Sequence, residues 1–176
     1  MARARHTTAE FDVEIAISAR GFRGPEWPQI LGQDGRKTVL VLGDSFALGW
    51  GVEQSEGLAG CLAAVHPEWD VLNAAVSGYG TDQQLLLLQC LLPDVRPDLV
   101  VCVFCANELW ESMADMAYGR RKPRFRSVAF ALQLDGVPVP SSLLDREPHR
   151  GRFPIDGHWN AVGHAAVAQG LAAPIH

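Results

Sequence analysis

The chain has 176 residues, of which 48% are hydrophobic and 20% charged, and its formal net charge is −5. This length suits one folded domain with a sizeable core, and the acidic balance argues against a general nucleic-acid binder, which needs basic contacts to phosphate. No apolar stretch reaches the length of a membrane-spanning helix, and no apolar segment follows the basic N-terminus. We therefore expect neither a membrane span nor a signal peptide, and the sequence as written favours the cytoplasm.

The four cysteines do not show the spacing of a disulfide framework; they are Cys61, Cys90, Cys102 and Cys105. Cys102 and Cys105 have a redox or zinc spacing, but they lie in an apolar run that is typical of a buried strand. Residues three apart in a strand point to opposite faces, so the pair is poorly placed to share a metal. We expect both to be small buried side chains, and we predict no metal and no cofactor.

The first 34 residues are expected to form an extended N-terminal arm. Residues 1–10 are predicted to be loose, whereas apolar and polar residues alternate at the start of 11–17, which indicates a half-exposed strand or extended segment. A region rich in glycine and proline at 21–28 leads to the main domain, to which we assign residues 35–176.

Strands and helices are predicted to alternate in the main domain. Strands are expected at 38–42, 69–74 and 98–104, and helices at 56–65 and 83–92. Each helix is predicted to stop before a proline, Pro67 or Pro93. The second helix is leucine-rich nearly all round, so we expect it to be well covered. This order of elements implies a parallel sheet with right-handed crossovers.

The pattern weakens after residue 107. We expect a short helix at 109–118, a basic loop at 120–126, a hairpin at 130–139 turning at Asp135-Gly136, a loop at 140–153 and a last helix at 161–172. The basic loop is most simply a solvated surface, and the alternative is a patch that meets an anionic substrate or carrier.

Polar residues follow each predicted strand and precede the last helix. Ser45, in a Gly-Asp-Ser tripeptide, follows the first strand, Gly78 the second and Asn107 the third. Since the carboxyl ends of parallel strands share one edge of a sheet, we expect these three residues to meet there. Asp156 and His158 precede the last helix. Taken singly, each residue is explained as well by a turn, a helix cap or a surface histidine.

Together these residue types suit nucleophilic catalysis. A serine hydroxyl is a weak nucleophile until a base removes its proton, and His158 is the candidate base because imidazole titrates near neutral pH. Asp156 can accept a hydrogen bond from the other ring nitrogen and stabilise the imidazolium. Attack by Ser45 on an ester would then leave a negative carbonyl oxygen that needs hydrogen-bond donors.

Over roughly residues 35–172 these stretches resemble the SGNH (GDSL) hydrolases. The resemblance implies an α/β three-layer sandwich with a parallel, flavodoxin-like sheet. It also implies a serine esterase that hydrolyses small acyl or acetyl esters through an acyl-enzyme on Ser45, with Asp156 and His158 completing the catalytic residues. The implied oxyanion hole consists of the backbone N–H groups of Ser45 and Gly78 and the side-chain amide of Asn107.

Two departures from the family pattern stand out. The third motif, usually Gly-x-Asn-Asp, here reads Cys-Ala-Asn-Glu and ends at Glu108. The insert at about 109–155 is also too short for the usual further strand–helix units, so the sheet is expected to be abbreviated after its third strand. That strand then lies near an edge, which the hairpin covers or a second chain seals in a homodimer, unless the shortened chain folds or functions poorly.

Other functions stay open on the sequence alone. The same Ser45 chemistry serves acyl or acetyl transfer to a sugar hydroxyl, and a degenerate family member would bind an acylated ligand or a partner without turnover. A metal site of Asp156, His158 and His164 is disfavoured because no fourth ligand is evident. The expected substrate is a small-molecule ester, and neither nucleic acid nor a membrane is an expected partner.

Overall fold

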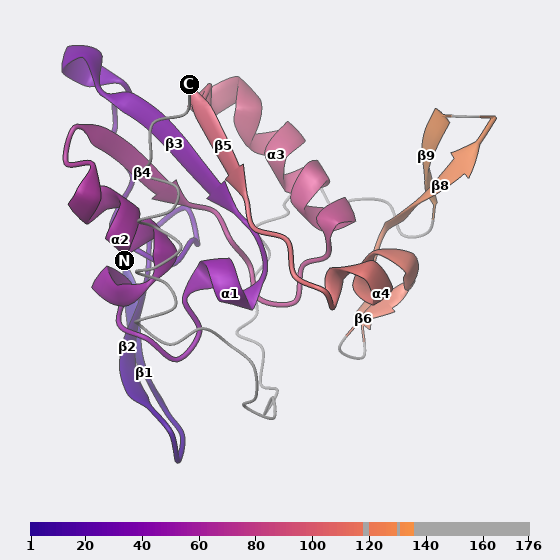
Figure 1. Cartoon of the computed structure of the whole chain (residues 1–176), viewed down its shortest axis with the longest axis horizontal. Coiled ribbons are helices and arrows are strands. Elements are labelled where there is room, and N and C mark those ends of the chain that lie inside the picture. Colours follow the sequence, from indigo (N-terminus) through magenta and orange to yellow (C-terminus); the bar gives the residue numbers. More distant parts are fainter. Residues whose placement is uncertain (118–119, 130, 136–176) are drawn as a thin grey trace.

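The computed structural model describes residues 1–117, 120–129 and 131–135. At its centre is a parallel sheet of β3 (Lys37–Leu42), β4 (Trp69–Asn73) and β5 (Leu99–Cys102), in the spatial order β4-β3-β5 (Figure 1). The first strand of the sheet in sequence is therefore the middle strand in space, which is the start of a flavodoxin-like order. The predicted α/β fold class, abbreviated after the third strand, is confirmed for the described residues.

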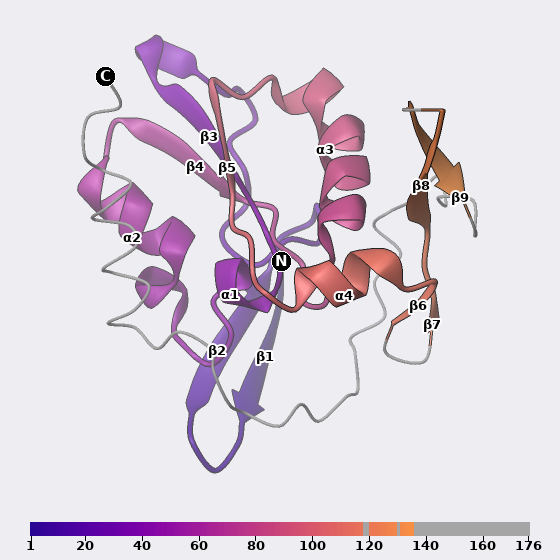
Figure 2. The ribbon, with the colours of Figure 1, turned by 45° about the vertical axis from the view of Figure 1, so that its right-hand side comes forward.

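β3 is buried on both faces because helices cover both sides of the sheet. α2 (Leu58–Val65) lies on one side and α3 (Thr81–Val95) on the other (Figure 2). Alternate residues of β3 point to opposite faces, so Leu40 and Leu42 join the cluster under α3, and Val41 joins the cluster under α2. This double burial explains why the strand is a continuous apolar run.

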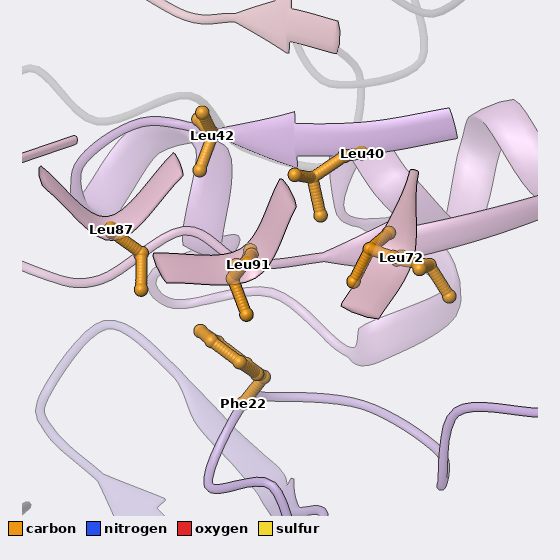
Figure 3. Close-up of a cluster of buried hydrophobic side chains, with 8 residues drawn as sticks. Phe22, Leu40, Leu42, Leu72, Leu87 and Leu91 are labelled. Atoms are coloured by element: carbon orange, nitrogen blue, oxygen red, sulfur yellow. The ribbon is translucent and has the colours of Figure 1, made fainter. Parts of the chain in front are cut away.

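The cluster under α3 contains leucines from the sheet and the helix together with one aromatic ring from the N-terminal arm. Figure 3 shows Phe22 pointing toward Leu91 of α3, with Leu40, Leu42 and Leu72 of the sheet close by. Phe22 is 1% exposed, so it is a core residue although it lies before the sheet in the sequence. The arm is thus packed onto the main domain.

The N-terminal arm begins with a hairpin, and the prediction that residues 1–10 are loose is wrong. β1 (Ala2–Thr7) pairs antiparallel with β2 (Asp12–Ile17). The predicted strand at 11–17 is confirmed, but its partner shows no apolar alternation because charge pairs hold it instead. Arg3 contacts Glu14 at 2.7 Å and Arg5 contacts Asp12 at 2.7 Å across the two strands.

Two helix boundaries differ from those predicted. The expected helix at 56–65 is divided into a 3₁₀ turn, η2 (Gln54–Glu56), and α2. α3 passes through Pro93 and ends at Val95. The next residue, Arg96, has a left-handed φ of 44°. A proline this near the end removes an N–H from the last turn only, so the helix continues. Leu85 and Leu92 of α3 are 37% and 41% exposed, so the described residues leave part of this helix uncovered.

The segment after β5 contains more strand than the sequence predicts. The helix expected at 109–118 is shorter, since α4 ends at residue 113. A hairpin forms between β8 and β9, with Ala129 after β8 at a left-handed φ of 49°, whereas the turn predicted at Asp135-Gly136 extends beyond the described residues. The elements are α4 (Glu108–Met113), β6 (Met116–Ala117), β7 (Arg120–Arg121), β8 (Arg124–Val128) and β9 (Ala131–Asp135). The loop expected at 140–153 and the helix expected at 161–172 lie outside the described residues.

The basic segment 120–126 is not a solvated loop. β7 and β8 take up most of it, and Lys122 is 3% exposed. The Lys122 ammonium contacts the buried Asp82 carboxylate in the first turn of α3 at 2.5 Å. This ion pair joins the segment to the start of α3. Separation of the two partners would be costly, because it would leave an uncompensated buried charge.

The outer edge of β5 has no strand partner among the described residues. β8 and β9 form a sheet of their own, so this hairpin does not cover the edge by pairing with it. In the described part of the chain, no helix is both long enough and apolar enough to span a bilayer.

The homodimer that would seal the edge of β5 stays a prediction. Sedimentation velocity at micromolar concentration is the direct measurement, and we expect a dimer because an exposed strand edge presents unpaired backbone groups. A monomer at that concentration would contradict this expectation.

Substitution of Gly43 tests the join between β3 and the helix that follows. Gly43 has a φ of 154°, and a Cβ built on it would lie 2.5 Å from the Cβ of Ala47. Gly35 also has a positive φ, of 77°, but nothing lies within 4 Å of its built Cβ, so it is the matched control. By urea denaturation, we expect Gly43→Ala to lose at least about 2 kcal/mol more free energy of unfolding than Gly35→Ala. Equal losses would show that packing around Gly43 is not limiting.

Candidate active site

The turn after β3 places Ser45 at the start of a single helical turn, α1 (Ser45–Leu48). Gly43 passes close under the helix, where no side chain would fit. Asp44 is fully buried, and its Oδ1 accepts a hydrogen bond from the backbone N–H of Phe46 at 2.9 Å. This cap helps to fix the first residue of α1, so the core of the domain determines where Ser45 lies.

The loop after β4 lies against this turn. The N–H of Ala74 donates to the Val41 carbonyl at 2.8 Å, and the N–H of Val76 donates to the Gly43 carbonyl at 3.0 Å. The loop then turns, with the N–H of Tyr79 donating to the Val76 carbonyl at 3.1 Å. Gly78 lies in this turn with a φ of 77°, a conformation that strongly favours glycine.

The loop after β5 completes the group. The N–H of Val103 donates to the Leu42 carbonyl at 2.9 Å, which continues the pairing with β3. Asn107 lies just before α4, and its side-chain Nδ2 is 3.3 Å from Oδ2 of Asp44 and 3.2 Å from Oε2 of Glu111. Both amide hydrogens of Asn107 therefore have a carboxylate acceptor.

The loops of Ser45, Gly78 and Asn107 thus meet at the carboxyl edge of the sheet, as the sequence predicts. Figure 2 shows α1 and α4 next to one another at the end toward which the strands point. Asp156, His158 and His164 lie outside the described residues, so the structure does not address the predicted base and its partner.

A buried polar network that the sequence analysis missed connects two of these loops. Glu108 is fully buried, and its Oε2 accepts a hydrogen bond from the Thr81 hydroxyl at 2.5 Å. Its Oε1 accepts from Gln84 Nε2 at 3.0 Å and from the Cys105 N–H at 3.3 Å. Gln84 Nε2 also donates to the Tyr79 carbonyl at 3.3 Å, so this one side chain contacts both the Gly78 loop and the Asn107 loop.

The replacement of the family aspartate by Glu108 has a structural role here. The side chain reaches α3, where it accepts hydrogen bonds from Thr81 and Gln84. One signal in the sequence pointed to Gln84, because it is a polar residue at helical spacing from Leu87 and Leu91 on the buried face of α3. A polar side chain on such a face needs a buried partner.

The pKa values of Glu108 and Cys105 at this edge are raised, which favours their neutral forms. Burial raises the pKa of the Glu108 carboxyl and the nearby Asp44 charge adds to this, although hydrogen bonds from Thr81, Gln84 and the Cys105 N–H oppose it. Burial and the charges of Asp44 and Glu108 raise the pKa of the Cys105 thiol to about 11. Cys105 is therefore a protonated thiol at neutral pH and a poor nucleophile.

The prediction that Cys102 and Cys105 are both buried is wrong. Cys102 is exposed and Cys105 is partly exposed, because β5 is the outer strand of the described sheet. The thiol of Cys102 donates to the side-chain oxygen of Gln84 at 3.2 Å, which adds to the buried network. Across residues 1–117, 120–129 and 131–135, no three His, Cys, Asp or Glu side chains are grouped as they would be to hold a metal ion.

Glu108→Gln separates the shape of this carboxyl from its charge. The amide oxygen can accept the bonds from Gln84 and Cys105, and the NH₂ group can donate to Thr81. The pKa of Glu108 is raised in the folded state, so folding favours the protonated carboxyl. The parent keeps this stabilisation below the unfolded pKa of 4.5 and loses it as the pH rises through the folded pKa. In urea denaturation at pH 4 and pH 8, we therefore expect the variant to gain stability relative to the parent at the higher pH.

Glu108→Ala is the control for the lost hydrogen bonds. It leaves the Gln84 amide and the Cys105 N–H without their acceptor, and we expect it to cost at least about 2 kcal/mol at both pH values. A difference between Glu108→Gln and the parent that does not change with pH would contradict the raised pKa.

Comparison with known proteins finds similar esterases and a matching family. The curated Esterase TesA of Pseudomonas aeruginosa is 27% identical over 144 residues, which cover 80% of this chain and 70% of TesA. The crystal structure of the psychrotrophic esterase EstA from a Pseudoalteromonas species, inhibited by monoethylphosphonate, is 28% identical with a TM-score of 0.38. That likeness spans less than half of either protein, 45% of each chain. The profile of the GDSL-like lipase/acylhydrolase family matches residues 41–136, which is more than half of the chain, and the protein belongs to this family.

Proposed function

We propose that the protein is a serine esterase that hydrolyses small acyl or acetyl esters, with Ser45 as the nucleophile. The observation that carries the proposal is the hydrogen bond between Asn107 and Asp44, because it joins the loop after β5 to the turn that bears Ser45. The family assignment and the likeness to a curated esterase support the reaction class.

The reaction proceeds in two steps. His158 takes the hydroxyl proton of Ser45 while the serine oxygen attacks the ester carbonyl, and the alcohol leaves with that proton. Water, deprotonated by His158, then attacks the acyl-enzyme, releases the acid and restores the Ser45 hydroxyl. Asp156 orients the imidazole and stabilises its charged form. The roles of Asp156 and His158 rest on the sequence motif.

Three donors are proposed for the developing oxyanion: the N–H groups of Ser45 and Gly78, and the Asn107 amide. The two hydrogens of the amide already face Asp44 and Glu111, so one of them must be released for substrate. Asp44 is fully buried and also caps α1, whereas Glu111 lies on the more exposed α4. We infer that Asp44 orients the amide and that substrate displaces Glu111.

Hydrolysis of p-nitrophenyl acetate by the purified protein tests the nucleophile and the base. We expect Ser45→Ala and His158→Ala each to lower kcat by at least about 10³-fold, because removal of either group stops activation of the hydroxyl. Ser55→Ala changes an exposed serine of η2 and is the control. A fluorophosphonate probe should label the parent and the control but not Ser45→Ala.

The outcomes of this assay separate the alternatives. A folded parent that neither hydrolyses the ester nor labels would contradict the esterase and favour a non-catalytic binder. Labelling of Ser45 with product formation only when a sugar acceptor is added would favour an acyltransferase.

Asn107→Ala and Glu111→Ala test the oxyanion donor as a pair. We expect Asn107→Ala to lower kcat by about 10²- to 10³-fold, because one donor to the oxyanion is lost, and to change KM little. Glu111→Ala frees a hydrogen of the same amide, so kcat should stay at the parent value or rise. Thermal unfolding of both variants reports any loss of fold. An unchanged kcat in Asn107→Ala at equal stability would exclude this donor.

A further inference from the structure

We propose that the N-terminal arm, residues 1–34, holds the Ser45 turn in place, and that Arg23 is the positioning residue. The inference rests on the proposed role of Ser45 as the nucleophile. The family profile begins at residue 41, so family membership does not account for the arm. In Figure 1 the β1–β2 hairpin lies at the same end of the sheet as α1.

α1 needs support from outside itself. It has four residues and ends at Gly49, whose φ is 86°. One helical turn is unfavourable on its own, because few hydrogen bonds offset the ordering of its backbone. The loop that follows is tied to it, since the N–H of Trp50 donates to the Ser45 carbonyl at 3.0 Å. Movement of the loop at residues 49–52, termed the post-serine loop, would therefore displace Ser45.

Arg23 supplies donors to this loop. Its Nη1 donates to the carbonyls of Gly49 and, at 3.3 Å, Leu48, and its Nη2 donates to the Val52 carbonyl at 2.6 Å. The same Nη2 lies 3.5 Å from the Glu14 carbonyl of β2, so one guanidinium joins the arm to both ends of the post-serine loop. Arg23 is 3% exposed, and a charge is retained at such depth only where hydrogen bonds meet it.

Aromatic side chains of the hairpin also contact the post-serine loop. His6 packs edge-on against Trp50 with ring centroids 4.7 Å apart, and Phe11 packs against the same ring at 6.3 Å. A Cβ built on Gly51 would lie 2.9 Å from the Phe11 ring, so the hairpin closely covers the loop at this point. Both these rings and the Arg23 guanidinium therefore contact the post-serine loop.

The backbone of Arg23 is itself fixed. The preceding residue, Phe22, is a core residue under α3 (Figure 3). Its ring stacks on Trp27 with ring centroids 4.8 Å apart. The backbone of Arg23 also forms an isolated antiparallel β-bridge with Ile17, the last residue of β2. A supporting side chain that is anchored in the core can hold a reacting group to the accuracy that catalysis needs.

Arg36 offers a matched control. Its guanidinium donates to Asp70 Oδ1 at 2.6 Å and to the carbonyls of Pro67 and Trp69 at 2.8 and 2.5 Å. Like Arg23, it donates to backbone carbonyls, but it also pairs with the Asp70 carboxylate and lies at the amino end of β4, which is opposite to Ser45. Loss of either arginine should lower the melting temperature, and only loss of Arg23 should affect the post-serine loop.

The experiment compares Arg23→Met with Arg36→Met in the full chain, at a temperature where both are folded. We expect Arg23→Met to lower kcat for p-nitrophenyl acetate by about 10- to 100-fold, with KM within about threefold of the parent, because Ser45 is displaced while the binding surface remains. Hydrogen exchange of the amides at 48–52 should become faster in this variant. Arg23→Lys keeps the charge but not the fork of donors, so its kcat should be intermediate. Arg36→Met should change neither kcat nor exchange at 48–52.

Unchanged exchange at 48–52 in a folded Arg23→Met, or an equal loss of kcat in Arg36→Met, would overturn the proposal. If Arg23→Met does not fold, Arg23→Lys and Phe11→Ala carry the same comparison, since the Phe11 ring also packs on this loop. A parent that neither hydrolyses the ester nor reacts with fluorophosphonate contradicts the proposed function. The exchange comparison then still decides whether Arg23 holds the loop.

Discussion

The burial of β3 on both faces is the constraint on which the rest of the structure depends. β4 pairs with residues 37–41 of this strand and β5 with residues 39–42, and helices pack on either side of it. Gly43 at its end is closed in by Ala47 and Val103, which directs the chain into α1. Core packing thus determines where α1 begins, and the loop that follows α1 is bonded back to Ser45.

The carboxyl edge of the sheet is held together by buried polar side chains, in contrast to the apolar core beneath it. Asp44 contacts Asn107, and Glu108 contacts both Gln84 and Thr81, so three loops from different strands are connected. Such a network is stable only when each buried group has a partner. The longer side chain of Glu108 meets this requirement by reaching α3, so the departure from the family motif is accommodated at this edge.

Buried charged side chains from two segments outside the sheet support the loops of the candidate site. The N-terminal arm contributes Phe22 to the core and Arg23 to the loop after α1. At the other side, Lys122 forms a buried ion pair with Asp82 at the start of α3. Arg23 binds the loop after α1, and Lys122 binds the helix that follows the Gly78 loop. These contacts help to hold the loops of the candidate site beside the three described strands of the sheet.

The amino-acid sequence by itself determined the order of strands and helices in the sheet and the meeting of the Ser45, Gly78 and Asn107 loops, because apolar periodicity and strand polarity are local properties. The tertiary structure alone decided the contacts of Arg23 and Glu108. Arg23 binds backbone carbonyls, which every residue carries, and Glu108 finds Gln84 across 24 positions, so neither contact leaves a local pattern. Lys122 was predicted to be solvated because it lies within a basic run. It is buried instead, because its partner Asp82 is distant in the sequence and leaves no local pattern.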